Sequence, residues 1–205
     1  MFFKKKERIK KYSFYTACFG KYDEKHSSAD FYFDEDNNPY DGCADNLSDR
    51  LKAKLYKVIN PLSYDVWIDS SIEFVNRKGF EELLSGDLCV LKHPFHKNLQ
   101  EELDLCHKLG YVNEKQKKNI KFLYKSIGMK LIDTPVYSGG ILYRTNKSKN
   151  FNDLWWRLIC QYSYRDQLTL PYAINVMSKL KFNVIDLDVF NNEYFVVNNH
   201  KKKDE

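Results

Sequence analysis

The chain has 205 residues, of which 43% are hydrophobic and 16% aromatic, enough to bury one core of domain size. Its formal net charge of +5 arises from 33 Lys and Arg residues interspersed with 28 Asp and Glu residues, a pattern that argues against the basic stripe of a nucleic-acid-binding protein. No segment approaches the roughly 20 apolar residues of a membrane-spanning helix, and the basic N-terminus lacks the apolar stretch of a secretory signal, so we expect a cytoplasmic protein.

The five cysteines indicate a reducing compartment, because none of them forms a C-x-x-C pair and their number is odd. Cys18, Cys89 and Cys160 lie in apolar segments, which predicts that they are small buried side chains without disulfides. Short lysine runs at 4–6 and 201–203 are compatible with peripheral contact to an anionic membrane surface or to a diphosphate.

Predicted strands and helices alternate along the chain. β-forming segments occur at 12–19, 30–33, 64–68, 87–91, 129–132, 141–144, 183–187 and 194–197. Helical spacing occurs at 48–59, 80–84, 99–109, 114–127 and around 154–162, and a further helix begins near residue 166 with Pro171 close to its start. The alternation predicts a single α/β domain over 1–205, with a central, mostly parallel sheet and helices on both faces.

Polar segments directly follow several predicted strands. In a parallel sheet, ligands bind beyond the carboxyl ends of the strands, so we expect these segments to share one rim. They are residues 20–23, 69–71, 93–96 and 144–146.

Asp69 stands where an apolar strand ends, in 63-SYDVWIDSSIEF-74. A carboxylate left unpaired there is costly, and a divalent cation with oxygen ligands is one partner that makes the position favourable. Ser71 lies two residues on and Glu73 four residues on, so strand alternation predicts that all three side chains face the same side. The alternative interpretation is that Asp69 caps a loop or pairs with a lysine.

Two later segments also combine groups suited to a ligand. In 138-SGGILYRTN-146, Gly139 and Gly140 permit the close approach of a ligand, although for the glycines alone a tight turn before a strand is the favoured explanation. In 164-YRDQLTLPY-172, Arg165, Asp166 and Gln167 offer several hydrogen-bonding groups for sugar hydroxyls, whereas the alternative is a simple helix cap.

The segment 92-KHPFH-96 places His93 and His96 in an H-x-x-H pattern. No further histidine or cysteine lies at a spacing typical of zinc sites, so the pattern favours a contact with phosphate or a hydroxyl group. His200 follows the last predicted strand, from which it could reach over the rim.

The order of these motifs resembles a glycosyltransferase-like family long known as a domain of unknown function. The motifs are YTACFGKYD, AKLYKV, YDVWIDSSI, KHP, SGGILYR and WW followed by RDQ, and they extend from residue 15 to about residue 172. The family includes plant mucilage and pollen-development proteins, small bacterial proteins and chlorella-virus glycosyltransferases. The same order is similar to that of the glycogenin-type retaining transferases.

The resemblance implies a GT-A-like fold, a nucleotide-sugar donor, with a UDP-hexose expected, and Mn²⁺ or Mg²⁺ as cofactor. Transferred by position, the catalytic residues would be Asp166, Gln167 and Arg165, and the metal ligands Asp69, Ser71 and His200. The donor would contact Tyr15, Thr16, Ala17, Phe19, Lys54, Lys57, Ser70, Ser71, Gly139, Gly140, Arg144 and His93. The chain departs from the family pattern at Ser71, which replaces the second carboxylate of Asp-x-Asp, and at His96, where arginine is frequent.

Together with this resemblance, the sequence predicts a hexosyltransferase that acts on a glycan or protein-linked acceptor. We expect a monomer or a weak dimer, which is either a protein by itself or one domain of a larger protein. One alternative is a nucleotidyltransferase, but the loop FGKYDEKH after the first strand has one glycine and two acidic residues where a glycine-rich basic loop is expected. The other is a non-catalytic module that binds carbohydrate or nucleic acid through the 15 tyrosines.

Overall fold

The computed structural model describes residues 12–20, 28–38, 47–59 and 65–198. A six-stranded sheet at its centre has the order β2-β1-β3-β6-β5-β7. Its neighbours β1/β2, β1/β3 and β5/β7 are parallel, whereas β6 is antiparallel to both β3 and β5. The prediction of an α/β fold with a mostly parallel central sheet is confirmed. The strands are β1 (Phe14–Ala17), β2 (Phe31–Phe33), β3 (Val66–Ile68), β5 (Leu88–Lys92), β6 (Tyr137–Arg144) and β7 (Phe182–Ile185).

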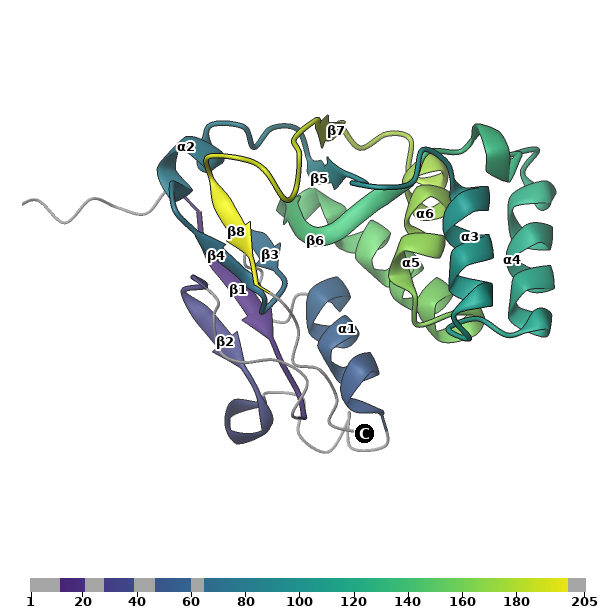
Figure 1. The fold of residues 1–205 in the computed structure, drawn as a ribbon, viewed down its shortest axis with the longest axis horizontal. Coiled ribbons are helices and arrows are strands. Elements are labelled where there is room, and N and C mark those ends of the chain that lie inside the picture. The colour runs from purple at the N-terminus through teal and green to yellow at the C-terminus, as the bar shows by residue number, and fades with distance from the viewer. Residues whose placement is uncertain (1–11, 21–27, 39–46, 60–64, 199–205) are drawn as a thin grey trace, which may run out of the picture.

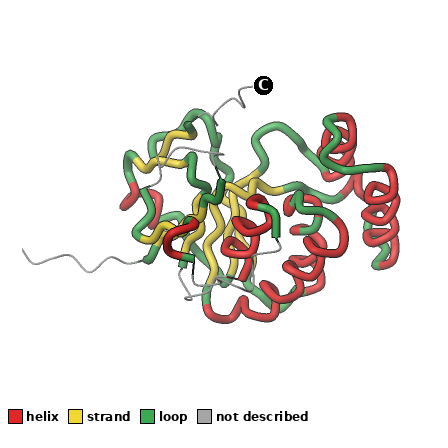
Figure 2. Tube along the Cα trace, turned by 90° about the horizontal axis from the view of Figure 1, so that it is seen from below, coloured by secondary structure: helices red, strands yellow, loops and turns green. Residues whose placement is uncertain are grey.

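Two separate hydrophobic clusters cover the two faces of this sheet. One cluster joins the sheet to the longer helices, and the other joins it to a short helix and a second, two-stranded sheet (Figures 1 and 2). Side chains of the central strands alternate between the two clusters, as the period of two in a strand requires. The first face carries α1 (Asp49–Ile59), α3 (Leu99–Lys108), α4 (Glu114–Ser126), α5 (Lys149–Tyr162) and α6 (Leu170–Val176), and the second carries α2 (Arg77–Glu81), β4 (Ile72–Phe74) and β8 (Phe195–Val197).

Local sequence signals explain where these helices begin. The Asn98 side chain accepts a hydrogen bond from the Glu101 amide at the start of α3, and Asn113 with Gln116 forms a capping box at the start of α4. Pro171 occupies the first turn of α6, the part of a helix where its missing N–H costs nothing.

Three local features differ from the prediction. Residues 129–132 do not form a strand, because Leu131–Asp133 is a 3₁₀ turn that buries Leu131 and leaves Ile132 exposed. The strand β4 was not predicted, since it becomes a strand only by pairing with β8 more than 120 residues later. Cys160 is exposed on α5 and not buried as expected, whereas Cys18 and Cys89 are buried and free.

The direction of β6 corrects the prediction that residues 144–146 share the rim. Because β6 is antiparallel, its last residue, Arg144, lies beside Leu88, where β5 begins. Its first residue, Tyr137, lies beside Lys92, where β5 ends. The paired glycines near the start of β6 therefore lie at the carboxyl ends of β3 and β5.

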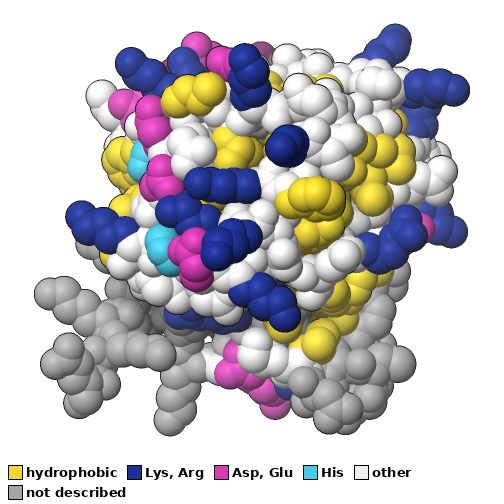
Figure 3. Space-filling model, turned by 90° about the vertical axis from the view of Figure 1, so that its right-hand side faces the viewer, with side chains coloured by type: hydrophobic (Ala, Val, Ile, Leu, Met, Phe, Trp, Pro, Cys, Tyr) yellow, Lys and Arg dark blue, Asp and Glu magenta, His cyan; other side chains and the backbone are white. Residues whose placement is uncertain are grey.

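The lysine-rich surface is mixed in charge. On the face shown in Figure 3, Lys and Arg side chains are spread among Asp, Glu and hydrophobic side chains and do not form a single stripe. Over the described part of the chain, the helices are too short or too polar to cross a membrane.

Candidate functional site

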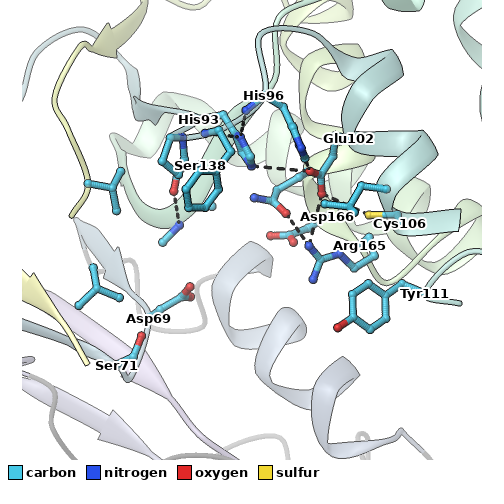
Figure 4. A pocket seen from close by; sticks show the side chains of 18 of the residues that line it. Asp69, Ser71, His93, His96, Glu102, Cys106, Tyr111, Ser138, Arg165 and Asp166 are labelled. Atoms are coloured by element: carbon cyan, nitrogen blue, oxygen red, sulfur yellow. Dashed lines mark hydrogen bonds and ion pairs between the residues drawn. The ribbon is translucent and has the colours of Figure 1, made fainter. Parts of the chain in front are cut away.

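A cavity of about 350 Å³ lies at the rim where β3 and β5 end (Figure 4). Its walls come from α1, the turn after β3, the loop after β5, α3, the start of β6, and the 3₁₀ turn Asp166–Leu168 that precedes α6. This is the position at which an α/β sheet is expected to bind a ligand.

The cavity brings together ten of the residues to which the resemblance assigned a catalytic, donor-binding or metal-binding role. They are Lys54, Lys57, Asp69, Ser71, His93, Gly139, Gly140, Arg165, Asp166 and Gln167. Six other described candidates do not line it, and these are Tyr15, Thr16, Ala17, Phe19, Ser70 and Arg144. His200 lies outside the described residues.

Asp69 presents its carboxylate to the cavity. Its Oδ1 accepts a hydrogen bond from Trp67 Nε1 at 3.0 Å, and its amide donates to the Gly140 carbonyl at 2.7 Å. Within the described residues, no lysine or arginine forms an ion pair with Asp69. Figure 4 shows this carboxylate directed toward the centre of the cavity. Its charge raises the pKa of Lys57 from a longer distance, so the interpretation of Asp69 as the partner of a lysine holds only as a long-range interaction.

Ser71 reaches the same cavity through a turn and not through strand alternation. Strand β3 ends at Ile68, and the amide of Ile72 then donates to the Asp69 carbonyl at 3.0 Å, which closes a tight turn. The turn breaks the alternation on which the prediction for Glu73 depended. Glu73 consequently lies exposed on β4 and does not line the cavity, which corrects that prediction.

Asp166 forms a buried ion cluster with two lysines of α1. Its Oδ1 lies 2.9 Å from Lys54 Nζ and its Oδ2 lies 2.6 Å from Lys57 Nζ, and only 3% of the residue is exposed. Burial alone would raise the pKa of Asp166, but the two ammonium groups outweigh it and hold this pKa well below its usual range. Asp166 therefore stays ionised and is a weak base.

Lys57 is almost fully buried, which makes its charge depend on its partners. Burial lowers the pKa of Lys57, and the charge of Asp166 opposes that effect. Its ammonium group also donates to the Gly139 carbonyl. A β-carbon on Gly139 would lie 2.5 Å from Lys57 Nζ and 3.1 Å from Asp166 Oδ2. Because Gly139 has no side chain, the ion cluster of Asp166 and Lys57 can pack directly against the backbone of β6. From the sequence, this glycine was expected to make room for a ligand or to form a turn.

A second buried polar group lies across the cavity, around Glu102. This carboxylate is 3% exposed, and its Oε2 lies 2.7 Å from His96 Nδ1. Its Oε1 contacts Cys106 Sγ at 3.2 Å and Arg165 Nη2 at 3.3 Å. Glu102 was not predicted from the sequence, although its spacing of four to Cys106 places both residues on one face of the predicted helix.

His93, His96 and Glu102 together could hold a metal ion, because each offers a ligand atom and these atoms lie within 4.8 Å of one another. His93 limits this use. Its Nδ1 accepts backbone N–H groups from His96 at 2.9 Å and from Phe95 at 3.3 Å, so in the neutral ring Nε2 carries the proton. Burial lowers the pKa of His93 and favours that neutral form, although Glu102 opposes the shift. Nε2–H suits a phosphate or hydroxyl oxygen and must lose its proton before it can ligate a cation.

Arg144 and Tyr15 belong to the core and not to the donor site predicted for them. The Arg144 guanidinium donates to the Val58 carbonyl at 2.8 Å and to Asn152 Oδ1 at 2.9 Å, and it also donates to the Lys57 carbonyl and to the Tyr15 hydroxyl. Burial raises the pKa of Tyr15 to about 12 even though Arg144 lowers it. These contacts satisfy carbonyl groups at the end of α1 and so fix the helix that carries the two lysines.

The site therefore consists of a carboxylate without a direct ion pair in the described residues, a carboxylate held by two lysines, and a histidine–glutamate group, all facing one cavity. The chain matches no protein-family model, no curated protein and no solved structure.

Proposed function

We propose that the protein is a metal-assisted glycosyltransferase that moves a hexose from a nucleotide sugar, with a UDP-hexose expected, to a hydroxyl group of an acceptor. The observation that carries the proposal is that Asp69 and Asp166 line the same cavity in opposite electrostatic settings. Asp69 forms no ion pair with a lysine or arginine of the described residues and acts on Lys57 only at longer range, whereas Asp166 is paired directly with Lys54 and Lys57. One carboxylate is thus suited to a cation and the other to a sugar.

The oxygen atoms of Asp69 and Ser71 fit a hard divalent cation such as Mn²⁺ or Mg²⁺. When bound there, such an ion would supply Lewis-acid neutralisation of the diphosphate that leaves the sugar. Lys54, whose side chain is 25% exposed, adds a positive charge at the same wall of the cavity. His93, a neutral hydrogen-bond donor, is suited to a phosphate oxygen.

Asp166 is assigned a positioning role. Because Lys54 and Lys57 already balance its charge, this carboxylate is suited to accepting hydrogen bonds from sugar hydroxyls and not to stabilising positive charge at the anomeric carbon. Arg165 and Gln167 lie beside it, with Arg165 Nη2 3.0 Å from Gln167 Oε1, and they can orient sugar hydroxyls. The low pKa of Asp166 argues against its use as a general base.

The proposal is tested by incubating the protein with UDP-, GDP- and dTDP-hexoses, with and without Mn²⁺, and measuring nucleotide release. We expect release from a UDP-hexose in the presence of the metal. Asp69→Asn should lower the rate by about 10²-fold or more, because one electrostatic contact to the leaving group is lost. Glu73→Gln is the matched control, since it removes a carboxylate four residues away that lies outside the cavity.

Full activity of a folded Asp69→Asn protein would contradict the assignment of this carboxylate. Release of hexose 1-phosphate in place of a nucleoside diphosphate would favour nucleotidyl transfer. The position of the cation is tested by the Mn²⁺ concentration that gives half-maximal rate. Asp69→Asn should raise this Mn²⁺ concentration and His96→Asn should leave it unchanged. An increase in His96→Asn but not in Asp69→Asn would place the ion at His93, His96 and Glu102.

A further inference from the structure

The mouth of the cavity is apolar and exposed to solvent. Among the residues that the structure describes, eleven large hydrophobic side chains are exposed, and five of these line this one cavity. Single exposed hydrophobic residues are ordinary, but a group gathered around a polar cavity indicates a surface that binds an apolar partner. The five are Phe95, Leu105, Leu109, Tyr111 and Phe190.

One wall of the cavity is a continuous row of rings that leads from the polar floor to this mouth. His96 stacks on His93 with ring centroids 5.0 Å apart, and His93 meets Phe95 edge to face at 6.3 Å. Phe95 then stacks on Phe190 at 5.4 Å. The two phenylalanines are 71% and 60% exposed, so the row begins in the buried site and ends in solvent.

A second apolar wall comes from α3 and the residues after it. Leu105 and Leu109 are four residues apart and so lie on one face of the helix end, where they are 39% and 53% exposed. Tyr111 continues this wall, and the Arg165 guanidinium lies 5.1 Å from the centre of its ring. This contact joins the apolar wall to the polar cluster on the floor, which Figure 4 shows with Tyr111 below Arg165.

We infer that the acceptor is an amphiphile, a hydroxyl-bearing head group attached to a hydrocarbon chain, as in a glycolipid. The inference rests on the proposed function and names the acceptor class for the same site. Of the five side chains at the mouth, only Tyr111 carries a polar atom, so the mouth offers few hydrogen-bond partners for a free glycan. The leucines and stacked phenylalanines gain from burying hydrocarbon, because apolar area removed from water is the main source of such affinity.

This placement fits the order of events in transfer. The head group lies between the donor sugar at the polar floor and the mouth, and the chain lies along the mouth. The acceptor oxygen forms a bond to the anomeric carbon of the donor, and the bond from that carbon to the diphosphate breaks with its electron pair on the diphosphate. The hydroxyl proton passes to water or buffer.

The test compares octyl and methyl glycosides of the same hexose, below the micelle concentration, as acceptors and as ligands in fluorescence titrations. We expect the octyl glycoside to bind at least about tenfold more tightly, since each buried CH₂ contributes favourably. Phe95→Ser and Phe190→Ser should shrink that octyl-to-methyl ratio several-fold. Phe122→Ser is the matched control, because Phe122 is 71% exposed on α4 and does not line the cavity.

Equal affinity for the two glycosides, tighter binding of a free oligosaccharide such as maltohexaose, or the same loss in Phe122→Ser would overturn the inference. The binding measurement does not depend on catalysis. If no nucleotide sugar is turned over but octyl glycosides bind selectively through Phe95 and Phe190, the proposed function fails and the amphiphile site stands. If nucleotide sugars are turned over but octyl glycosides bind no more tightly than methyl glycosides, the proposed function stands and the inference of an amphiphilic acceptor fails.

Discussion

At the scale of single residues, the charges of Asp166, Lys54 and Lys57 depend on one another, because the three groups form one buried ion cluster. Lys57 is 1% exposed and contacts a carboxylate, a backbone carbonyl and, at 5.9 Å from its ring centre, the indole of Trp155. A buried ion pair of this kind contributes little net stability, but removal of one partner is strongly destabilising because the other charge remains buried and unpaired. The cluster is therefore a fixed electrostatic element and not a mobile contact.

Asp166→Asn is expected to lower the free energy of unfolding at pH 7 by about 3–5 kcal/mol, because it leaves Lys57 buried without its counter-ion. The pKa of Asp166 is lower in the folded protein than in the unfolded chain. Its contribution is therefore complete above the unfolded pKa of about 4 and is lost as the pH falls below it. Urea unfolding between pH 7 and pH 3 should show that decline in the natural protein and a flatter curve in the variant.

A variant as stable as the natural protein would show that the lysines are satisfied in some other way. Glu73→Gln again provides the control, because an exposed carboxylate outside the cluster should change neither the stability at pH 7 nor its decline in acid by more than about 0.5 kcal/mol.

At the scale of elements, α3 has two roles that its neighbour α4 does not share. One face of α3 buries Glu102 and Cys106 in the polar cluster, and its carboxyl-terminal end presents Leu105 and Leu109 to the cavity mouth. Helix α4 packs against α3 and lines no part of the cavity. A change in the register or stability of α3 should therefore affect the site, whereas the same change in α4 should affect only the fold.

Asn98→Ala and Asn113→Ala test this difference, since each removes the side chain that caps the start of one helix. Each should lower the free energy of unfolding by about 1 kcal/mol. Only Asn98→Ala should also raise KM for the acceptor, because α3 positions lining residues. Similar KM effects of the two substitutions would mean that the helices move as one unit and that α3 has no separate role in the site.

At the scale of the whole molecule, the sheet brings distant segments to one rim. Asp69 follows β3 and His93 follows β5. Gly139 and Gly140 lie near the start of β6, which runs antiparallel to both of these strands. The cavity is thus assembled from segments between residues 54 and 197. A ligand that bridges them should stabilise the domain as a unit.

We expect a UDP-hexose with Mn²⁺, at a hundredfold excess over its Kd, to stabilise the folded protein by about 2.7 kcal/mol. For a domain of this size that corresponds to a rise in Tm of roughly 5–10 °C. Near- and far-ultraviolet circular dichroism should report the same single transition, as a single cooperative domain requires. Two separated transitions, or stabilisation by oligonucleotides and by no nucleotide sugar, would contradict the domain assignment and the proposed function respectively.

The sequence by itself determined most of the elements and the α/β class of the fold. Short β-forming apolar segments marked the central strands, helical spacing marked α3 and α4, and the polar residues after strands pointed to Asp69 and His93. These signals are local, since they depend on backbone preferences and on the period of side chains along one segment. They are therefore readable without knowledge of what each segment contacts.

Only the tertiary structure decided which polar groups meet. The reversed direction of β6 moved Arg144 into the core and brought Gly139 to the rim, and no local signal distinguishes an antiparallel strand from its parallel neighbours. The partners of Asp166 come from a helix more than 100 residues earlier, and Glu102 joined the histidines only when α3 packed beside their loop. Charge, protonation and metal affinity depend on such neighbours in space, because electrostatic interactions act over a few ångströms of distance and not over sequence separation.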